Sequence, residues 1–336
     1  MPTNVTPEYK KAEQAYRRAG DARERLDALR EMQRALPKHK GTEHLQADIK
    51  TRIKELTEEV AGPRKGGART GPATVVRPEG AAQVALVGPP SSGKSRLHAA
   101  LTGSHAAIGE HLFTTQWPMA GMLPYEDIAI QLVDLPAISP AHEVPWIGNA
   151  LQPADAVALV IDLGHAGCVA EVVELHEILN ARRIYLEPEW SSDADDPQGD
   201  DPFARHLPAV IVANKSDVIT DVAAELDVFR ELTGFAYPTL VVSAATGEGL
   251  QELAEWLFSH LGIVRVYTKI PHQPPDMGRP YTLRAGETVA DLAALVHRDF
   301  AESLQFARLW GGGDFDGQQV GADRILADGD VVELHV

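Results

Sequence analysis

The chain has 336 residues, 44% of them hydrophobic and 24% charged, an ordinary globular composition that allows two or three folded domains. A net charge of -17 at pH 7 argues against binding nucleic acid or an anionic membrane through overall charge, so no DNA or membrane partner is expected. The single cysteine, Cys168, excludes an internal disulfide, and the lack of a signal peptide or a membrane-length apolar run predicts a cytoplasmic protein.

Residues 1–61 are predicted to form a helical hairpin. Apolar residues recur at helical spacing through residues 7–36, where Pro37 ends the run, and again through residues 45–60. Residues 62–80, rich in Gly and Arg, are predicted to be a linker. The first 70 residues carry a charge of +5 and the rest -22, so this end is the better candidate for contacting a polyanion.

Residues 81–262 are predicted to form an α/β domain, and residues 263–336 a smaller α+β domain. In the larger domain, apolar runs rich in Val and Ile alternate with helix-like segments, which predicts a mostly parallel sheet with helices on both faces. The acidic segment 187–201 is expected to be a solvated loop. The predicted strands are Gln83–Val87, Ile128–Val133, Ala156–Ile161, Pro208–Ala213 and Pro238–Val242.

A phosphate-binding loop follows the first strand. The pattern G-x-x-x-x-G-K-S lies between a predicted strand and a helix-forming run, which is the context that supports the motif. Backbone N–H groups would wrap the phosphates, Lys94 would reach the β- and γ-oxygens, and Ser95 would supply an oxygen to Mg²⁺. The residues predicted to bind the nucleotide here are Gly88, Pro89, Pro90, Ser91, Ser92, Gly93, Lys94, Ser95 and Arg96.

Two later strand ends suggest that the base is guanine. The fourth predicted strand runs into Asn214-Lys215-Ser216-Asp217, where the Asp217 carboxylate could accept hydrogen bonds from N1–H and the amino group of guanine, which adenine cannot offer. Asn214 would reach N7 and Lys215 would cover the ring. After the fifth strand come Ser243 and Ala244, and the Ala244 N–H could donate to O6. An adenine-nucleotide kinase or ATPase on the same loop is the less favoured alternative.

A Mg²⁺ site is expected beside the phosphate loop. Asp134 ends the second predicted strand and would hold the ion through water, as the acidic partner of Ser95. Upstream, Thr115 is the first choice and Thr114 the second for a hydroxyl that reaches the metal from a mobile segment. Lys94, Thr115 and Asp134 are the predicted catalytic residues, and Ser95, Thr115 and Asp134 the predicted metal ligands.

Together these motifs resemble the G motifs of a translation-factor-class GTPase. Residues 42–56 are similar to the helical region before the G domain in the DRG branch of the Obg family. The end of the chain, from Val264-Arg265-Val266-Tyr267 to Asp328-Gly329-Asp330-Val331, resembles a TGS domain, a β-grasp module. The resemblance covers residues 42–336. It implies a P-loop G domain, GTP or GDP as ligand, and a ribosome, RNA or translation-associated protein as partner.

Three departures from the family pattern bear on hydrolysis. The family's Asp-x-x-Gly is Asp-Leu-Pro-Ala here, so Ala137 replaces a glycine that takes unusual backbone angles cheaply. Ile138 follows and cannot orient water, and the Gly/Arg-rich stretch and inserted domain of DRG proteins are missing. His142 is a candidate for positioning water, against the simpler interpretation of a solvated loop histidine. Ser91 stands where potassium-stimulated relatives carry Asn, so K⁺ dependence stays open.

The sequence therefore predicts a slow Mg²⁺-dependent GTPase acting as a switch. The alternative is a guanine-nucleotide-binding adaptor that does not hydrolyse GTP and works through its terminal domains. The C-terminal domain has seven Lys/Arg against eleven acidic residues, which argues against a broad basic surface that binds the phosphates of RNA.

Overall fold

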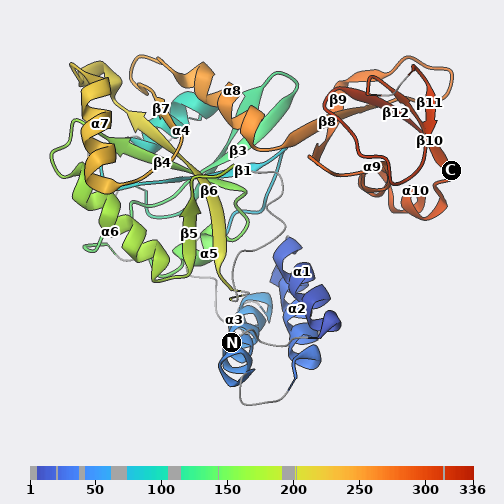
Figure 1. Ribbon diagram of the computed structural model, residues 1–336, viewed down its shortest axis with the longest axis horizontal. Helices are drawn as coiled ribbons and strands as arrows, with labels where there is room; N and C mark the ends of the chain where they lie inside the picture. The colour runs from blue at the N-terminus through green and yellow to red at the C-terminus, as the bar shows by residue number, and fades with distance from the viewer. Residues whose placement is uncertain are drawn as a thin grey trace. The chain divides into compact units, whose positions relative to one another are not determined.

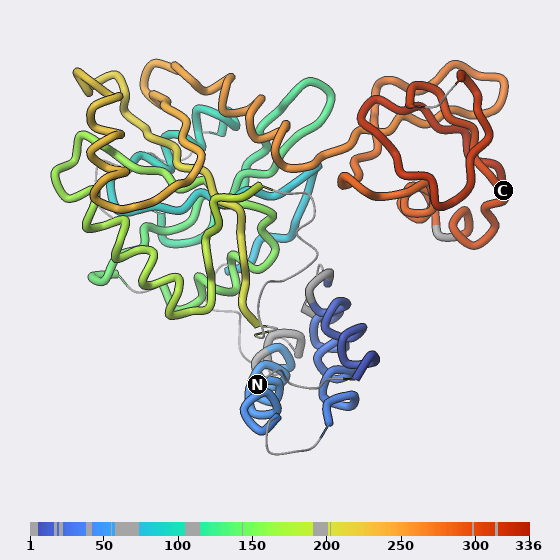
Figure 2. The backbone as a smooth tube through the Cα atoms, viewed as in Figure 1, coloured from blue at the N-terminus to red at the C-terminus, as the bar shows by residue number. Residues whose placement is uncertain are grey.

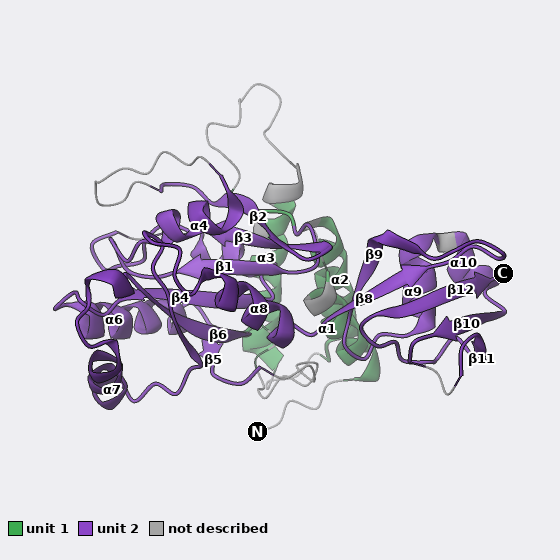
Figure 3. Ribbon diagram, turned by 90° about the horizontal axis from the view of Figure 1, so that it is seen from above, with its two compact units in different colours: residues 1–77, 198–204 green, residues 78–197, 205–336 purple. Residues whose placement is uncertain are grey.

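The structure is a computed structural model that describes residues 6–19, 22–37, 42–61, 74–104, 115–142, 144–190, 201, 203–312 and 315–336. The chain divides into two compact units (Figure 3). One comprises Met1–Arg77 with Gln198–Ala204, and the other comprises Pro78–Pro197 with Arg205–Val336. The backbone path through each unit can be followed in Figure 2.

The first unit is a bundle of three helices: α1 (Pro7–Arg18), α2 (Ala22–Ala35) and α3 (Glu43–Ala61). The side chain of Thr6 caps α1 by accepting a hydrogen bond from the backbone N–H of Tyr9, which satisfies a free N–H of the first turn. Buried Leu29, Met32 and Ile49 form its core. The single helix predicted over residues 7–36 is wrong: α1 ends before Ala19, whose backbone is extended (φ -63°, ψ 121°).

The second unit contains a seven-stranded sheet in the order β2-β3-β1-β4-β6-β5, with β7 beside the last residues of β6 (Figure 1). All neighbours are parallel except β2 and β3, which form a hairpin at the sheet edge. The predicted mostly parallel sheet is confirmed, and β2 and β5 are added to it. The strands are β1 (Gln83–Val87), β2 (Met119–Tyr125), β3 (Ile128–Asp134), β4 (Ala156–Asp162), β5 (Ile184–Glu187), β6 (Arg205–Asn214) and β7 (Thr239–Val241).

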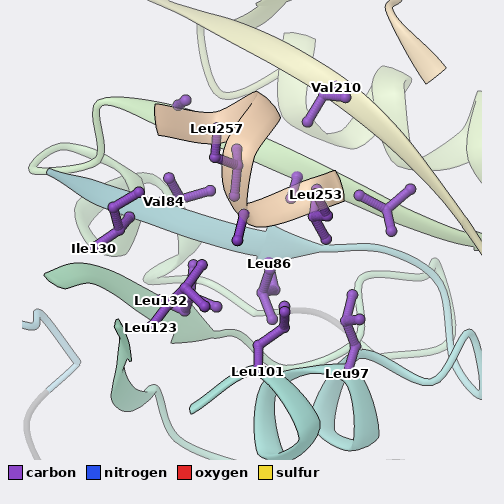
Figure 4. Packing of buried hydrophobic residues seen from close by; sticks show 14 of the residues in the cluster. Val84, Leu86, Leu97, Leu101, Leu123, Ile130, Leu132, Val210, Leu253 and Leu257 are labelled. Atoms are coloured by element: carbon purple, nitrogen blue, oxygen red, sulfur yellow. The ribbon is translucent and has the colours of Figure 1, made fainter. Parts of the chain in front are cut away.

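Helices cover this sheet. Leu97 of α4 (Lys94–Thr102) and Leu253 of α8 (Leu250–His260) pack with Val84 and Leu86 of β1 (Figure 4). Burying one such leucine contributes about 1.5–3 kcal/mol. Other helices are α6 (Cys168–Asn180), which packs against β4 and β5, α7 (Val222–Thr233) beside α6, the short α5 (Ile147–Leu151) and the 3-10 turn Ser216–Val218.

The position of the site follows from the strand directions. Because β1, β3, β4 and β6 run parallel, their carboxyl ends lie along the same edge of the sheet. Asp134 ends β3, Asp162 ends β4 and Asn214 ends β6, and the register pairs Asp162 with Asn214. The phosphate loop leaves β1 at the same edge.

The C-terminal residues form a five-stranded sheet in the order β11-β10-β12-β8-β9, in which β12 and β8 are parallel and the other pairs antiparallel. One helix, α9 (Val289–Val296), begins with a capping box between Thr288 and Asp291. Its Leu292 packs with Val266 and Val332 in a separate core, so the predicted β-grasp domain is confirmed. The other elements are β8 (Ile263–Thr268), β9 (Asp276–Arg284), α10 (Arg298–Ser303), β10 (Phe306–Trp310), β11 (Gln318–Val320) and β12 (Asp330–His335).

The limits predicted for the linker at residues 62–80 and for the division between residues 262 and 263 stay predictions. Most of the linker lies outside the described residues, although Gly80 at its end pairs with Ile130 of β3. Within the described part of the chain, every helix is too short or too polar to span a membrane.

Candidate functional site

The phosphate loop joins β1 to the first turn of α4. Lys94 is buried, and its ammonium donates hydrogen bonds to the carbonyls of Gly88 (3.0 Å) and Pro89 (2.9 Å). Burial lowers the pKa of Lys94 to about 8, although the nearby Asp134 charge acts in the opposite direction. Gly93 has φ of +91°, where a residue with a side chain is strained. The loop therefore places a desolvated ammonium on the backbone turn predicted to hold phosphates.

Three oxygen-bearing side chains meet beside this loop. The Ser95 hydroxyl donates to Asp134 Oδ2 at 2.6 Å and lies 2.8 Å from the hydroxyl of Thr115. Thr115 also lies 3.2 Å from the same carboxylate oxygen. The structure thus brings together the three predicted metal ligands, whereas the second choice, Thr114, lies outside the described residues, as does Phe113.

The donor chemistry of this cluster fits a small hard cation. Two hydroxyls and a carboxylate are oxygen donors of the kind that Mg²⁺ takes, with the remaining positions left for water and phosphate. Asp134 Oδ1 is buried and has no hydrogen-bond partner among the described residues. The pKa of Asp134 is raised by burial, although the hydrogen bond from Ser95 and the charge of Lys94 act in the opposite direction. A cation with its water would satisfy the unpaired oxygen.

The predicted guanine-binding residues lie next to the phosphate loop. The Asn214 side chain is buried, its amide nitrogen donates to the Ser92 carbonyl (3.0 Å), and its oxygen accepts from the Ala244 N–H (3.0 Å). Asp217 Oδ1 accepts a 2.6 Å hydrogen bond from the Ser243 hydroxyl, which orients the carboxylate. Asn214 thereby links three loops that are far apart in the sequence.

The base contact predicted for Ala244 requires a change from this arrangement, whereas the contact predicted for Asn214 does not. The Ala244 N–H, predicted to meet guanine O6, donates to Asn214 here. That hydrogen bond would have to be exchanged when the base arrives. The Asn214 amide carries a second hydrogen, which can be donated to guanine N7 while the first remains hydrogen-bonded to the Ser92 carbonyl.

A pocket of about 230 Å³ opens between the phosphate loop and the end of β4. Pro89, Pro90, Ser91 and Ser92 line one side, and Asp162, His165, Cys168, Glu171 and Lys215 the rest. Asp162 was not singled out from the sequence. The available signal was the one that marked Asp134: an aspartate at the end of a buried apolar strand.

The structure also shows where the other predicted residues lie. Arg96 is exposed on the first turn of α4, and Ser91 is exposed with φ of +58°. Ala137 and Ile138 are buried, and the Ile138 N–H donates to the Gly88 carbonyl at 3.3 Å. His142 closes a turn by donating its backbone N–H to the Ser139 carbonyl, and it lines a separate pocket of about 300 Å³. Of the acidic segment 187–201, residues 191–200 lie outside the described residues.

Two family models match the chain. Residues 83–188 match the model described as 50S ribosome-binding GTPase, and residues 264–336 match the TGS domain. The chain thus combines a G domain with a TGS domain, which confirms the resemblance inferred from the motifs.

Curated relatives resemble the chain over nearly its whole length. Developmentally-regulated G-protein 1 of Arabidopsis thaliana is 28% identical over 93% of this chain and 90% of its own. Developmentally-regulated GTP-binding protein 1 of Xenopus laevis is 27% identical over 88% of this chain and 94% of its own. Among solved structures, the Schizosaccharomyces pombe YchF GTPase has a TM-score of 0.51 at 12% identity over 77% of this chain and 99% of that one, a likeness of fold.

Proposed function

We propose that this chain, which resembles GTP-binding proteins of the DRG type, is a slow, Mg²⁺-dependent GTPase that works as a switch. The observation that carries the proposal is the hydrogen-bonded group of Ser95, Thr115 and Asp134 beside the phosphate loop. The hydroxyls of Ser95, in α4, and of Thr115, before β2, both contact the carboxylate of Asp134. In the proposed switch, Thr115 would join or leave this group according to the nucleotide bound.

Each residue has a role in the proposed reaction. Lys94 would leave the carbonyls of Gly88 and Pro89 and neutralise the β- and γ-phosphate oxygens. Ser95 and Thr115 would hold Mg²⁺ directly and Asp134 through water. When bound, Mg²⁺ supplies charge neutralisation for the phosphates.

Slow turnover follows from the residues after Asp134. The buried side chain of Ile138 has no polar atom with which to orient an attacking water. Water would then be aligned by backbone groups or by a partner, and the rate would rest on positioning and charge. Ala137 further restrains the backbone at the position where the family pattern has Gly.

The same two residues favour a second candidate function, a guanine-nucleotide-binding adaptor without hydrolysis. In that case nucleotide only orders the switch segments, and the ends of the chain engage a partner. For both candidates we propose a ribosome- or RNA-associated partner and a cytoplasmic location. K⁺ stimulation is not part of the proposal, because the Ser91 hydroxyl is a poorer fixed ligand than an amide.

Single-turnover hydrolysis of γ-labelled GTP with Mg²⁺, with and without ribosomes, separates the candidates. The GTPase releases phosphate in at least one condition, and EDTA stops it. The adaptor binds GTP and releases none in either. Equal affinity for ADP and GDP would overturn the guanine assignment that both candidates share.

A further inference from the structure

The geometry points to Asp162 as a positioning residue for Lys215, and hence for the guanine ring, in the base site proposed above. The inference rests on that proposed function. Asp162 ends β4, next to Asn214 in the parallel register, so it lies one strand away from the Asn-Lys-x-Asp turn. Its carboxylate forms an ion pair with the Lys215 ammonium, with Oδ2 2.6 Å from Nζ.

Both oxygens of this carboxylate are engaged, which fixes its direction. Oδ1 accepts a 3.0 Å hydrogen bond from the backbone N–H of Gly164, two residues on. Oδ2 accepts from Lys215. Because the Asp162 side chain is only 18% exposed and is held from both sides, it acts as a fixed anchor.

Lys215 lies on a strained turn beside the phosphate loop. Its φ is +65°, in the left-handed region that residues with side chains rarely adopt. Its stem passes the phosphate loop, since Cε lies 3.8 Å from the position a Cβ on Gly93 would take. The ion pair therefore fixes the four methylenes of Lys215, which lines the 230 Å³ pocket.

The pairing also decides how Lys215 contributes to binding. An ammonium held by a carboxylate adds little net charge toward the phosphates, whereas its extended stem offers an apolar surface to a flat purine. We therefore assign Lys215 a packing role over the base, with Asp162 setting the position of the stem. Asp162 then acts only through Lys215.

A double-mutant cycle tests this dependence. GDP dissociation constants are measured by calorimetry for the wild type, Asp162→Asn, Lys215→Met and the double variant. In the protein that keeps Lys215, Asp162→Asn is expected to weaken GDP binding about tenfold. In the Lys215→Met background the same change should weaken it less than about twofold, because the two substitutions remove one shared interaction. Glu174→Gln is the control: Glu174 is an exposed acidic residue of α6 outside the pocket lining, and its replacement should leave affinity within about twofold.

Equal weakening by Asp162→Asn in both backgrounds, or none in either, would overturn the inference. Circular dichroism checks each variant, and Asp162→Ser repeats the cycle if the Asn variant folds poorly. A wild type that binds GDP without this coupling refutes only the role of Asp162. A wild type that does not bind GDP refutes the proposed function itself.

Discussion

The side-chain amide of Asn214 donates a hydrogen bond of 3.0 Å to the backbone carbonyl of Ser92, 122 residues earlier in the chain. This bond ties the turn predicted to choose the base to the loop predicted to hold the phosphates. The same side chain accepts from the Ala244 N–H, so one buried residue sets the spacing of three loops. The three loops are therefore held together in the protein without nucleotide, although the hydrogen bond from Ala244 would have to be exchanged when the base arrives.

Asn214→Ala should damage both stability and binding. The change leaves the Ser92 carbonyl and the Ala244 N–H without their partner, which costs about 1–3 kcal/mol for each group that stays buried. We expect a lower melting temperature and at least about tenfold weaker GDP binding. Asn180→Ala, at the exposed end of α6, is the control and should leave both quantities unchanged. Unaltered GDP affinity in Asn214→Ala would contradict the linking role.

Gly93→Ala separates a steric clash from backbone strain. A Cβ at Gly93 would lie 2.3 Å from the Asn214 amide nitrogen, and φ is +91°. Gly103 is the matched control, because it also has a positive φ (+67°) but open space around its Cβ position. Gly103→Ala should lose only about 1 kcal/mol of stability and keep GDP binding. Gly93→Ala should lose detectable binding, and equal behaviour of the two variants would show that the clash is unimportant.

GDP affinity should fall as pH rises above about 8. In the nucleotide-free protein the pKa of Lys94 is lowered to about 8 by burial, whereas bound phosphates favour the charged ammonium. Between pH 8 and 10.5 binding must then take up a proton, which weakens it by up to about tenfold per pH unit.

The sign for folding is opposite. With a folded pKa below the unfolded value, the nucleotide-free native state binds fewer protons than the unfolded chain between pH 8 and 10.5, so its stability rises with pH there.

The prediction for binding is checked by calorimetry at pH 9 in two buffers of different ionisation enthalpy, which measures how many protons are taken up when GDP binds. No proton uptake at pH 9 would show that Lys94 does not meet the phosphates.

Ala137→Gly should accelerate hydrolysis if the protein is a GTPase. Ala137 has no positive φ here, and glycine would let its N–H turn toward the γ-phosphate at little cost. We expect about a tenfold higher single-turnover rate, equivalent to about 1.4 kcal/mol of barrier. Ala150→Gly, at a buried position in α5, controls for a general loss of packing and should not raise the rate. A rate unchanged in Ala137→Gly would place the limit elsewhere.

Local patterns made much of this molecule predictable. The phosphate loop and β1 form one continuous strand-loop-helix signal, and β3, β4 and β6 are buried apolar runs that end in Asp or Asn. The edge strand β2 was missed because Pro124 lies within it and its residues, Met-Ala-Gly-Met-Leu-Pro-Tyr, do not alternate between apolar and polar types. The separation of α1 from α2 had a signal in Gly20 and Asp21, poor helix formers, that the apolar spacing outweighed.

Tertiary contacts were beyond such patterns. The sequence placed Ala244 and Asn214 at one edge of the sheet, but it could not show that their polar groups bond to each other. Nor could it show that the Lys215 ammonium is held by Asp162, because the pair forms only when β4 and β6 lie side by side. Strand ends are predictable one at a time, whereas the partner of each side chain depends on the assembled sheet.

The identity of the base rests on Asp217, and exchanging that residue tests whether the protein selects guanine. An aspartate accepts from N1–H and the amino group of guanine, whereas an asparagine can donate to the carbonyl that xanthine carries in place of the amino group. The wild type should bind GDP more tightly than xanthosine diphosphate, and Asp217→Asn should reverse the order, with a change in the ratio of about a hundredfold or more. A variant that keeps the wild-type preference for GDP would contradict the assignment.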